Sequence, residues 1–224
     1  MPKNKLVLLI NDIYLFDHRS FASKKYHSKL KVFLSFLHYQ KVSKPIKFAY
    51  VGSPDQWLPD LTLKENILLD SIPSSLINTK EFVFAKYFKK SKNNFLTELL
   101  KEIDTLDQMP ETADNTTKKI ANLIKGFLLV ENTNYFMLEN PDKYLNEKQL
   151  DILKNALQFE SRARGINILI VTEKPKLWQN ISNKFVSQND QNEFIISPID
   201  RSQQDLQEEE QELDQYPSEE MKAS

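Results

Sequence analysis

The chain has 224 residues, 40% hydrophobic and 27% charged, which is enough apolar material for one globular domain with a substantial core. Its 30 basic and 31 acidic residues leave a net charge of −1, so the overall charge favours neither nucleic acid nor an anionic membrane as a partner. The absence of cysteine excludes disulfides, zinc–thiolate sites, cysteine-ligated iron–sulfur clusters and thiol nucleophiles.

The first half of the chain is predicted to alternate strands with helices. An apolar run at residues 5–10 predicts a buried strand, and apolar side chains spaced by three and four predict an amphipathic helix over residues 28–39. A second strand is expected at residues 46–51, before a turn that begins at Gly52. The next helix is expected to run to Leu69, with Asp60 or Thr62 as its cap and Glu65 in its first turn.

The second half continues the alternation. Helices are predicted at residues 95–103, 118–130 and 146–164, the last ended by Gly165, and a polar loop at residues 108–117. Strands are predicted at residues 135–138 and 166–171. This order implies an α/β fold with a largely parallel sheet. Residues 1–200 are expected to form the domain, and the acidic residues 201–224 a disordered tail or a solvated helix.

Glycine is scarce, which bears directly on phosphate binding. The chain has three glycines, and none precedes Gly52. A P-loop of the form G-x-x-x-x-G-K-[ST] needs two glycines at fixed spacing, because its backbone adopts positive φ angles close to the phosphate. The sequence contains no such pair and therefore no P-loop of this form.

Three segments resemble motifs of ABC ATPases, in the same order and at similar spacing. Residues 50–67 resemble the Q-loop and the segment that follows it, with Ser53 rather than Gln56 at the glutamine position. Residues 136–146 (FMLENPDKYLN) resemble the Walker B strand and D-loop, and residues 168–177 (ILIVTEKPKL) resemble the switch strand. The resemblance implies the P-loop NTPase-like fold of that family, a mainly parallel sheet flanked by helices, here with a reduced N-terminal β-lobe.

The sequence departs from the family at the residues that carry its chemistry. Glu139 stands where the family has the aspartate that supports magnesium, and Asn140 where it has the glutamate that polarises water. Glu173 replaces the switch histidine and places a negative charge at a γ-phosphate contact. The Walker A region, residues 11–28, and the signature region, near residues 113–117, contain no glycine. These departures predict a pseudo-ATPase that needs no metal and no cofactor.

The resemblance implies a non-catalytic subunit, structural or regulatory, of a membrane transport complex. Its expected partners are a transmembrane permease subunit and, as a second candidate, an active ATPase subunit. The predicted docking surface contains Trp57, Leu58, Leu61 and Leu63. No apolar run reaches the roughly 18 to 20 residues of a membrane span, so we expect a cytoplasmic protein held peripherally at the inner face of the cell membrane.

Three alternatives remain open at this level. An ABC-like fold without ATPase activity could bind DNA, as ABC-like CRISPR adaptation proteins do, in which case its two lysine clusters should converge on one surface. Nucleotide binding without hydrolysis could persist, or Glu139 and Asn140 could be strand-end residues of an unrelated α/β protein. The lysine clusters are Lys24, Lys25, Lys29 and Lys31, and then Lys86, Lys89, Lys90 and Lys92.

Overall fold

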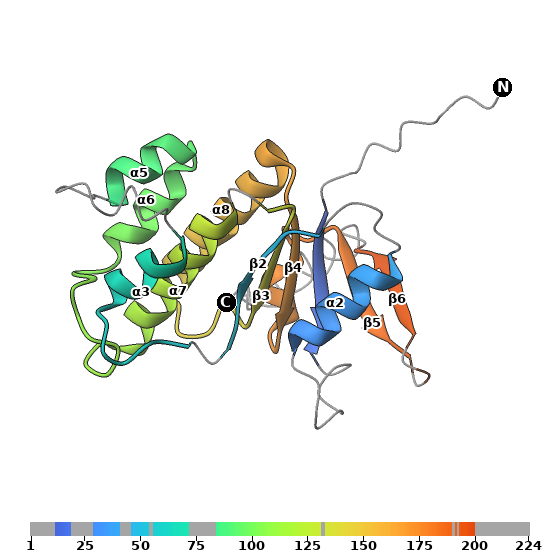
Figure 1. The fold of residues 1–224 in the computed structure, drawn as a ribbon. Coiled ribbons are helices and arrows are strands. Elements are labelled where there is room, and N and C mark those ends of the chain that lie inside the picture. The colour runs from blue at the N-terminus through green and yellow to red at the C-terminus, as the bar shows by residue number, and fades with distance from the viewer. Residues whose placement is uncertain are drawn as a thin grey trace, which may run out of the picture.

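The computed structural model describes residues 12–18, 29–40, 46–53, 56–71, 84–130, 133–189, 191 and 193–199. The strand predicted at residues 5–10, most of the Walker A region and the acidic residues 201–224 lie outside these described residues. Within them, the chain forms one layer of strands with helices on both sides (Figure 1).

One six-stranded sheet organises the described part of the chain, with the strand order β2-β3-β4-β1-β5-β6. Neighbouring strands run parallel from β2 to β5, and only β6 pairs antiparallel, with β5. The predicted fold class, a mainly parallel sheet flanked by helices, is confirmed. The strands are β1 (Ile13–Asp17), β2 (Phe48–Val51), β3 (Tyr135–Glu139), β4 (Asn167–Thr172), β5 (Lys184–Gln188) and β6 (Phe194–Pro198).

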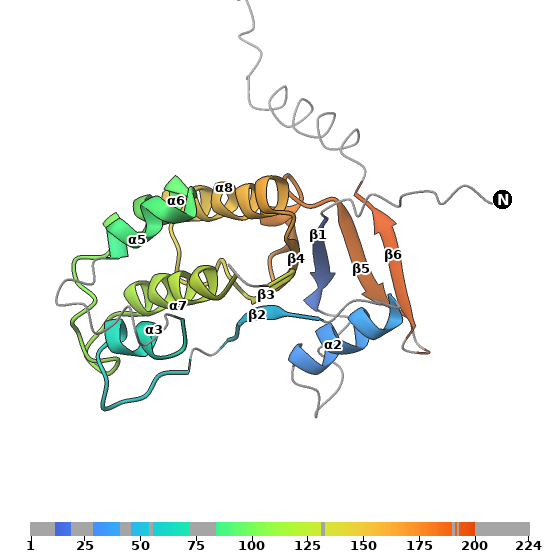
Figure 2. The same ribbon diagram turned by 45° about the horizontal axis from the view of Figure 1, so that its top comes forward.

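Both faces of the sheet are apolar and covered by helices. On β4, Ile168 and Ile170 belong to the larger core, whereas Leu169 and Val171 belong to a smaller core on the opposite face. The larger core lies under α7 (Asn115–Val130) and α8 (Glu147–Arg164), and α2 (Lys29–Tyr39) covers the smaller one (Figure 2). Burial on both faces explains why the sequence of β4 reads as a continuous apolar run.

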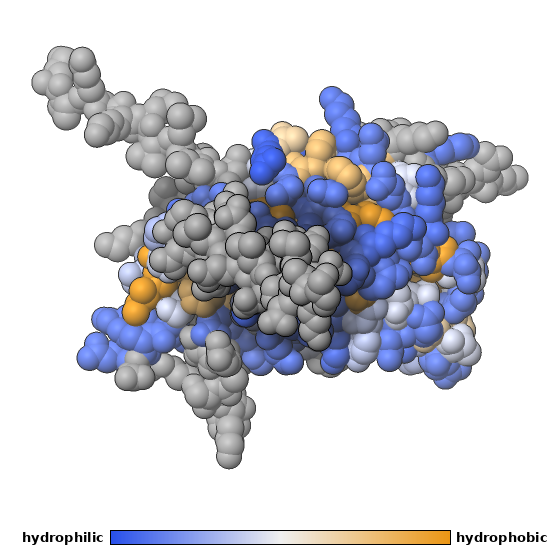
Figure 3. Space-filling model, turned by 180° about the vertical axis from the view of Figure 1, so that it is seen from behind, coloured by the Kyte–Doolittle hydropathy of each residue, from blue (hydrophilic) through white to orange (hydrophobic). Residues whose placement is uncertain are grey.

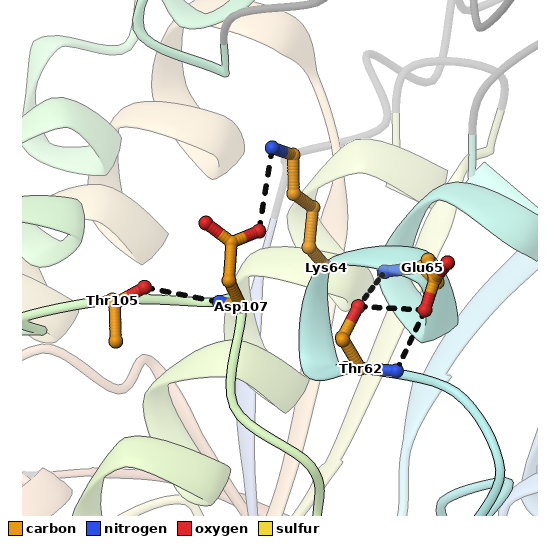
Figure 4. Close-up of polar contacts among 5 residues, drawn as sticks. All are labelled: Thr62, Lys64, Glu65, Thr105 and Asp107. Atoms are coloured by element: carbon orange, nitrogen blue, oxygen red, sulfur yellow. Dashed lines mark hydrogen bonds and ion pairs between the residues drawn. The ribbon is translucent and has the colours of Figure 1, made fainter.

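Three short helices gather at the ends of α7 and α8 away from the sheet (Figure 1). They are α3 (Leu63–Ser71), which packs on α7, and α5 (Phe84–Ser91) with α6 (Asn94–Lys101), of which α6 packs on α8. The predicted capping of α3 is confirmed: the Thr62 N–H donates to Glu65 Oε2 at 2.8 Å, and the Glu65 N–H donates to Thr62 Oγ1 at 3.2 Å (Figure 4). These hydrogen bonds lower the pKa of Glu65.

Local sequence features define the ends of α8 and let α7 pack closely on the sheet. Helix α8 has a capping box between Asn146 and Gln149 and ends at Gly165 with a φ of 73°, as its sequence predicts. On α7, a Cβ at Gly126 would lie 2.4 Å from Val51 Cγ2, so the missing side chain lets α7 approach β2.

The central strand β1 was not predicted. It occupies residues 13–17, within the region 11–28 that was expected to correspond to Walker A. Its side chains Leu15 and Phe16 are fully buried between β4 and β5. The segment is only five residues long and lies between polar residues, so its sequence carries little period-two signal. Strands β5 and β6 and helix α5 were also missed.

Candidate functional site

The predicted site residues meet at one edge of the sheet. Because β1, β3 and β4 are parallel, their carboxyl ends share an edge, which is where α/β proteins bind ligands. His18 follows β1, Glu139 ends β3, and Glu173 follows β4. Asn140 links two of these ends, because its Oδ1 accepts a hydrogen bond from the Glu173 N–H at 3.2 Å.

Glu139 is 4% exposed, and its carboxylate accepts hydrogen bonds from the protein itself. The Tyr50 hydroxyl donates a short hydrogen bond to Oε1, and the Ser53 N–H donates to Oε2 at 3.2 Å. Burial and this contact with Glu139 raise the pKa of Tyr50. Glu139 therefore ties β2 and the loop after it to β3, a role that the sequence alone did not reveal.

Asn140 fastens the end of β3 to β4. Its N–H donates to the Val171 carbonyl at 2.8 Å, and its own carbonyl accepts from the Lys143 N–H at 3.1 Å. Its φ is 41°, a left-handed conformation that asparagine adopts more readily than most residues. The side-chain amide is neutral and bound to backbone, so it has neither the charge nor the freedom of a general base.

Glu173 extends from the sheet edge toward the segment after β1. Its side chain is 68% exposed, and its Oε1 lies 3.7 Å from His18 Nε2, a contact that becomes an ion pair when the histidine is protonated. A carboxylate at this position repels an approaching phosphate, since like charges at a partly exposed site raise the energy of the complex.

Asp142 is a buried anchor that sequence reasoning missed. Its Oδ1 accepts hydrogen bonds from Thr172 Oγ1 at 2.6 Å and from Trp178 Nε1 at 3.2 Å. Trp178 is fully buried in the 3₁₀ helix η1 (Pro175–Trp178). Asp142 therefore holds the segment after β3 against the end of β4, which is a structural rather than a chemical role.

The signature region forms the start of α7 and carries its own anion. The Asp114 carboxylate accepts from the Thr117 N–H at 2.9 Å and from Thr117 Oγ1 at 2.6 Å. These hydrogen bonds lower the pKa of Asp114. Because the capping carboxylate already occupies the helix N-terminus, a phosphate would have to compete with it there.

The residues at the sheet edge do not fit a magnesium nucleotide. Both oxygens of Glu139 accept hydrogen bonds from the protein, Asn140 carries no charge, and Glu173 repels anions. Among the described residues, no group of three or more histidine, aspartate or glutamate side chains is placed to hold a metal ion.

The predicted docking surface is only partly exposed. Leu58 is 50% exposed, Leu61 is less exposed, and Trp57 is half-buried against the larger core. The prediction for Leu63 is wrong, because this first residue of α3 is fully buried where α3 packs on α7. The loop before α3 is shaped by Asn66, whose Oδ1 accepts from the Leu58 N–H at 2.9 Å.

No protein-family model and no curated protein matches the sequence. Solved structures do match the fold. An ATP-binding subunit of an ABC transporter aligns with a TM-score of 0.61 and 16% identity, over 88% of this chain and 82% of that chain. A dimeric ATP-binding cassette in a post-hydrolysis state, bound to ADP and Pi, aligns with a TM-score of 0.55 and 11% identity, over 85% of this chain and 87% of that chain.

The RNase-L inhibitor also aligns, with a TM-score of 0.57 and 13% identity, over 86% of this chain and 35% of that chain. At such identities the likeness shows the fold, which is that of ATP-binding cassettes. Within the described residues, no helix is long and apolar enough to cross a membrane.

Proposed function

We propose that this chain, which has the fold of the ATP-binding cassettes of ABC transporters, is a non-catalytic subunit of a membrane transport complex with a structural or regulatory role. The observation that carries the proposal is the state of Glu139. Its carboxylate accepts hydrogen bonds from the Tyr50 hydroxyl and the Ser53 N–H, so we assign it a structural role inside the protein rather than the support of a magnesium ion.

The neighbouring residues support the same conclusion. The side-chain oxygen of Asn140 accepts a hydrogen bond from the Glu173 N–H, and the Glu173 carboxylate contacts His18. Hydrolysis of a nucleoside triphosphate needs a metal and a positioned water. The neutral Asn140 amide cannot act as a base toward that water, and the Glu173 carboxylate repels the phosphate. We therefore propose that this chain binds a catalytic ATPase subunit or a permease subunit as its partner.

The proposed partner surface consists of Leu58, Leu61 and the exposed part of Trp57. Seen from behind, the described surface is mainly hydrophilic, with apolar side chains in separate patches (Figure 3). A transmembrane permease subunit that docks here would hold the chain peripherally at the inner face of the membrane. Residues 1–200 would form the docking domain, with residues 201–224 as an appended acidic segment.

Affinity purification of the tagged chain from its native membranes tests the proposal, with mass spectrometry of the bound proteins. We expect permease subunits to be retained by the wild-type chain and lost with Leu58→Asp. Leu177→Asp is the matched control, because Leu177 is also exposed but lies in η1. Recovery of the chain without integral membrane proteins would contradict the proposal.

The arrangement of the lysines weighs against the DNA-binding alternative. That alternative requires the two clusters to converge, but Lys31 lies on α2 and Lys86 on α5. These helices lie at opposite ends of the molecule in both ribbon views (Figures 1 and 2). DNA that copurifies with the chain and dissociates steeply with salt would restore the alternative.

A further inference from the structure

A cavity of about 330 Å³ lies beside the edge that contains Glu139 and Asn140, because its lining residues Ser53, Lys119 and Lys143 donate hydrogen bonds to these two residues. Three stretches of the chain surround it: the loop after β2, residues 110–119 before and at the start of α7, and the segment after β3. Three lysines line it, and we call it the lysine cavity. Its lining residues are Ser53, Trp57, Pro110, Glu111, Asn115, Lys118, Lys119, Lys143 and Tyr144.

Two of these lysines have no carboxylate partner among the described residues. In the part of the chain that the structure describes, the ammonium groups of Lys118 and Lys143 make no hydrogen bond or ion pair; Lys143 Nζ lies 5.0 Å from the centre of the Tyr144 ring. Elsewhere, Lys148 pairs with Glu102 at 2.5 Å, and Lys184 with Asp12 at 2.5 Å. The lysine cavity therefore gathers two lysines without an ion-pair partner among the described residues around one hollow.

The base of the lysine cavity adds a third cation and further donors. Lys119 is 2% exposed, and its Nζ donates to the Glu139 carbonyl at 3.5 Å. The buried Trp57 Nε1 has no hydrogen-bond acceptor among the described residues, which is a costly state for an N–H donor. Glu111 is the single carboxylate among the lining residues, and it is exposed. The lining therefore carries an excess of positive charge and at least one unsatisfied donor.

We propose that the lysine cavity binds a phosphate group, carried either by a small soluble molecule or by a lipid headgroup. Lysine binds phosphate as a point charge, and three lysines match the charge of a phosphate monoester or a diphosphate better than that of a single carboxylate. The volume is sufficient for a small ligand. The site is formed by one chain, and its lysines take the place of the motif glycines that this sequence lacks.

Isothermal titration calorimetry with inorganic phosphate and pyrophosphate tests the soluble source, and Trp57 at the cavity wall offers a fluorescence signal for the same event. We expect saturable binding, tighter for pyrophosphate. Lys118→Met and Lys143→Met should each raise Kd by about tenfold, the loss of one charge-assisted hydrogen bond. The matched control is Lys176→Met, an exposed lysine outside the cavity, which should leave Kd unchanged.

Glu111→Gln sharpens the test, because removing the one anion of the lining should lower Kd by about threefold without touching the core. Cosedimentation with phosphatidylcholine vesicles, with and without phosphatidic acid, tests the headgroup source. Lysine-dependent binding to the phosphatidic acid vesicles alone assigns the phosphate to a lipid, and binding to pyrophosphate assigns it to a soluble ligand. Absence of both, or equal losses in the Lys118, Lys143 and Lys176 variants, overturns the proposal. The readout is independent of the transport proposal.

Discussion

Two polar regions of this molecule lie close together in the chain yet are built in opposite ways. At the sheet edge, Glu139 and Asn140 are buried, and each is bonded to groups of the protein itself. In the lysine cavity, Lys118 and Lys143 have no ion-pair partner among the described residues. The first arrangement stabilises the fold, and the second leaves charge available to a ligand.

This difference indicates where to look for function in this chain. Glu139 and Asn140 are held by internal hydrogen bonds, so these residues should matter for stability. The lysine cavity should matter for binding and little for stability. Four substitutions test this division.

The largest effect is expected for Glu139→Ala. Removing the carboxylate leaves the Tyr50 hydroxyl and the Ser53 N–H without their acceptor in a buried place, which should lower the free energy of unfolding by about 3 kcal/mol. Glu139→Gln is the matched control, because its amide oxygen still accepts one hydrogen bond. Urea unfolding measures the free energy of unfolding of both variants. Equal stability of Glu139→Ala and wild type would contradict the structural role of Glu139.

Asn140→Glu should come next. It restores the residue that the family uses as a base, but it loses the bond to the Glu173 N–H and places a larger side chain at a φ of 41°. We expect a loss of about 1–2 kcal/mol in the free energy of unfolding and no gain of ATP hydrolysis. Asn140→Asp keeps the short side chain and should cost less. A gain of ATP hydrolysis in Asn140→Glu would contradict this, because it would show that the sheet edge can still position the groups that hydrolysis needs.

Tyr50→Phe should cost about 1 kcal/mol at neutral pH, since it removes one donor to Glu139. It should also change the response to alkali. Burial and Glu139 raise the pKa of Tyr50 in the folded state, so its contribution to stability is complete below the unfolded value of about 10 and is lost as the pH rises above it. The stability of Tyr50→Phe should therefore fall less steeply above pH of about 10, and parallel curves for both proteins would contradict this.

The smallest effect on stability is expected for Lys118→Met. Because its ammonium has no partner in the described chain, its loss should change the free energy of unfolding by less than about 0.5 kcal/mol. Thermal and urea unfolding beside the Glu139 variants measure this. A loss as large as that of Glu139→Ala would mean that the lysine cavity is structural, and the contrast between the two regions would disappear.

Local signals in the sequence predicted much of the fold. Helix α8 was located by the Asn146 cap and by Gly165, and β3 and β4 by their apolar runs, because these features act over a few residues. Strand β1 was missed since five residues with polar neighbours carry little period-two signal. Leu63 was placed on the surface because the sequence does not show which side of α3 faces α7.

The positions of the site residues could be predicted from the sequence, but their hydrogen-bond partners could not. The order of motifs placed Glu139, Asn140 and Glu173 at strand ends, where the structure has them. The bond from Tyr50 to Glu139 joins residues 89 positions apart, and no local pattern predicts that a hydroxyl will occupy that carboxylate. The lysine cavity likewise needs residues from three separate stretches, from Ser53 to Tyr144. Such long-range pairing becomes visible only in the folded chain.

The central claim is that the sheet edge has no catalytic function, and phosphate release from ATP tests it most directly. The purified full-length chain would be incubated with ATP and Mg²⁺ beside its Glu139→Gln variant. The account predicts no release above background for either protein. Turnover by the wild-type chain that Glu139→Gln abolishes would contradict it, because Glu139 would then support a metal rather than hold Tyr50 and Ser53.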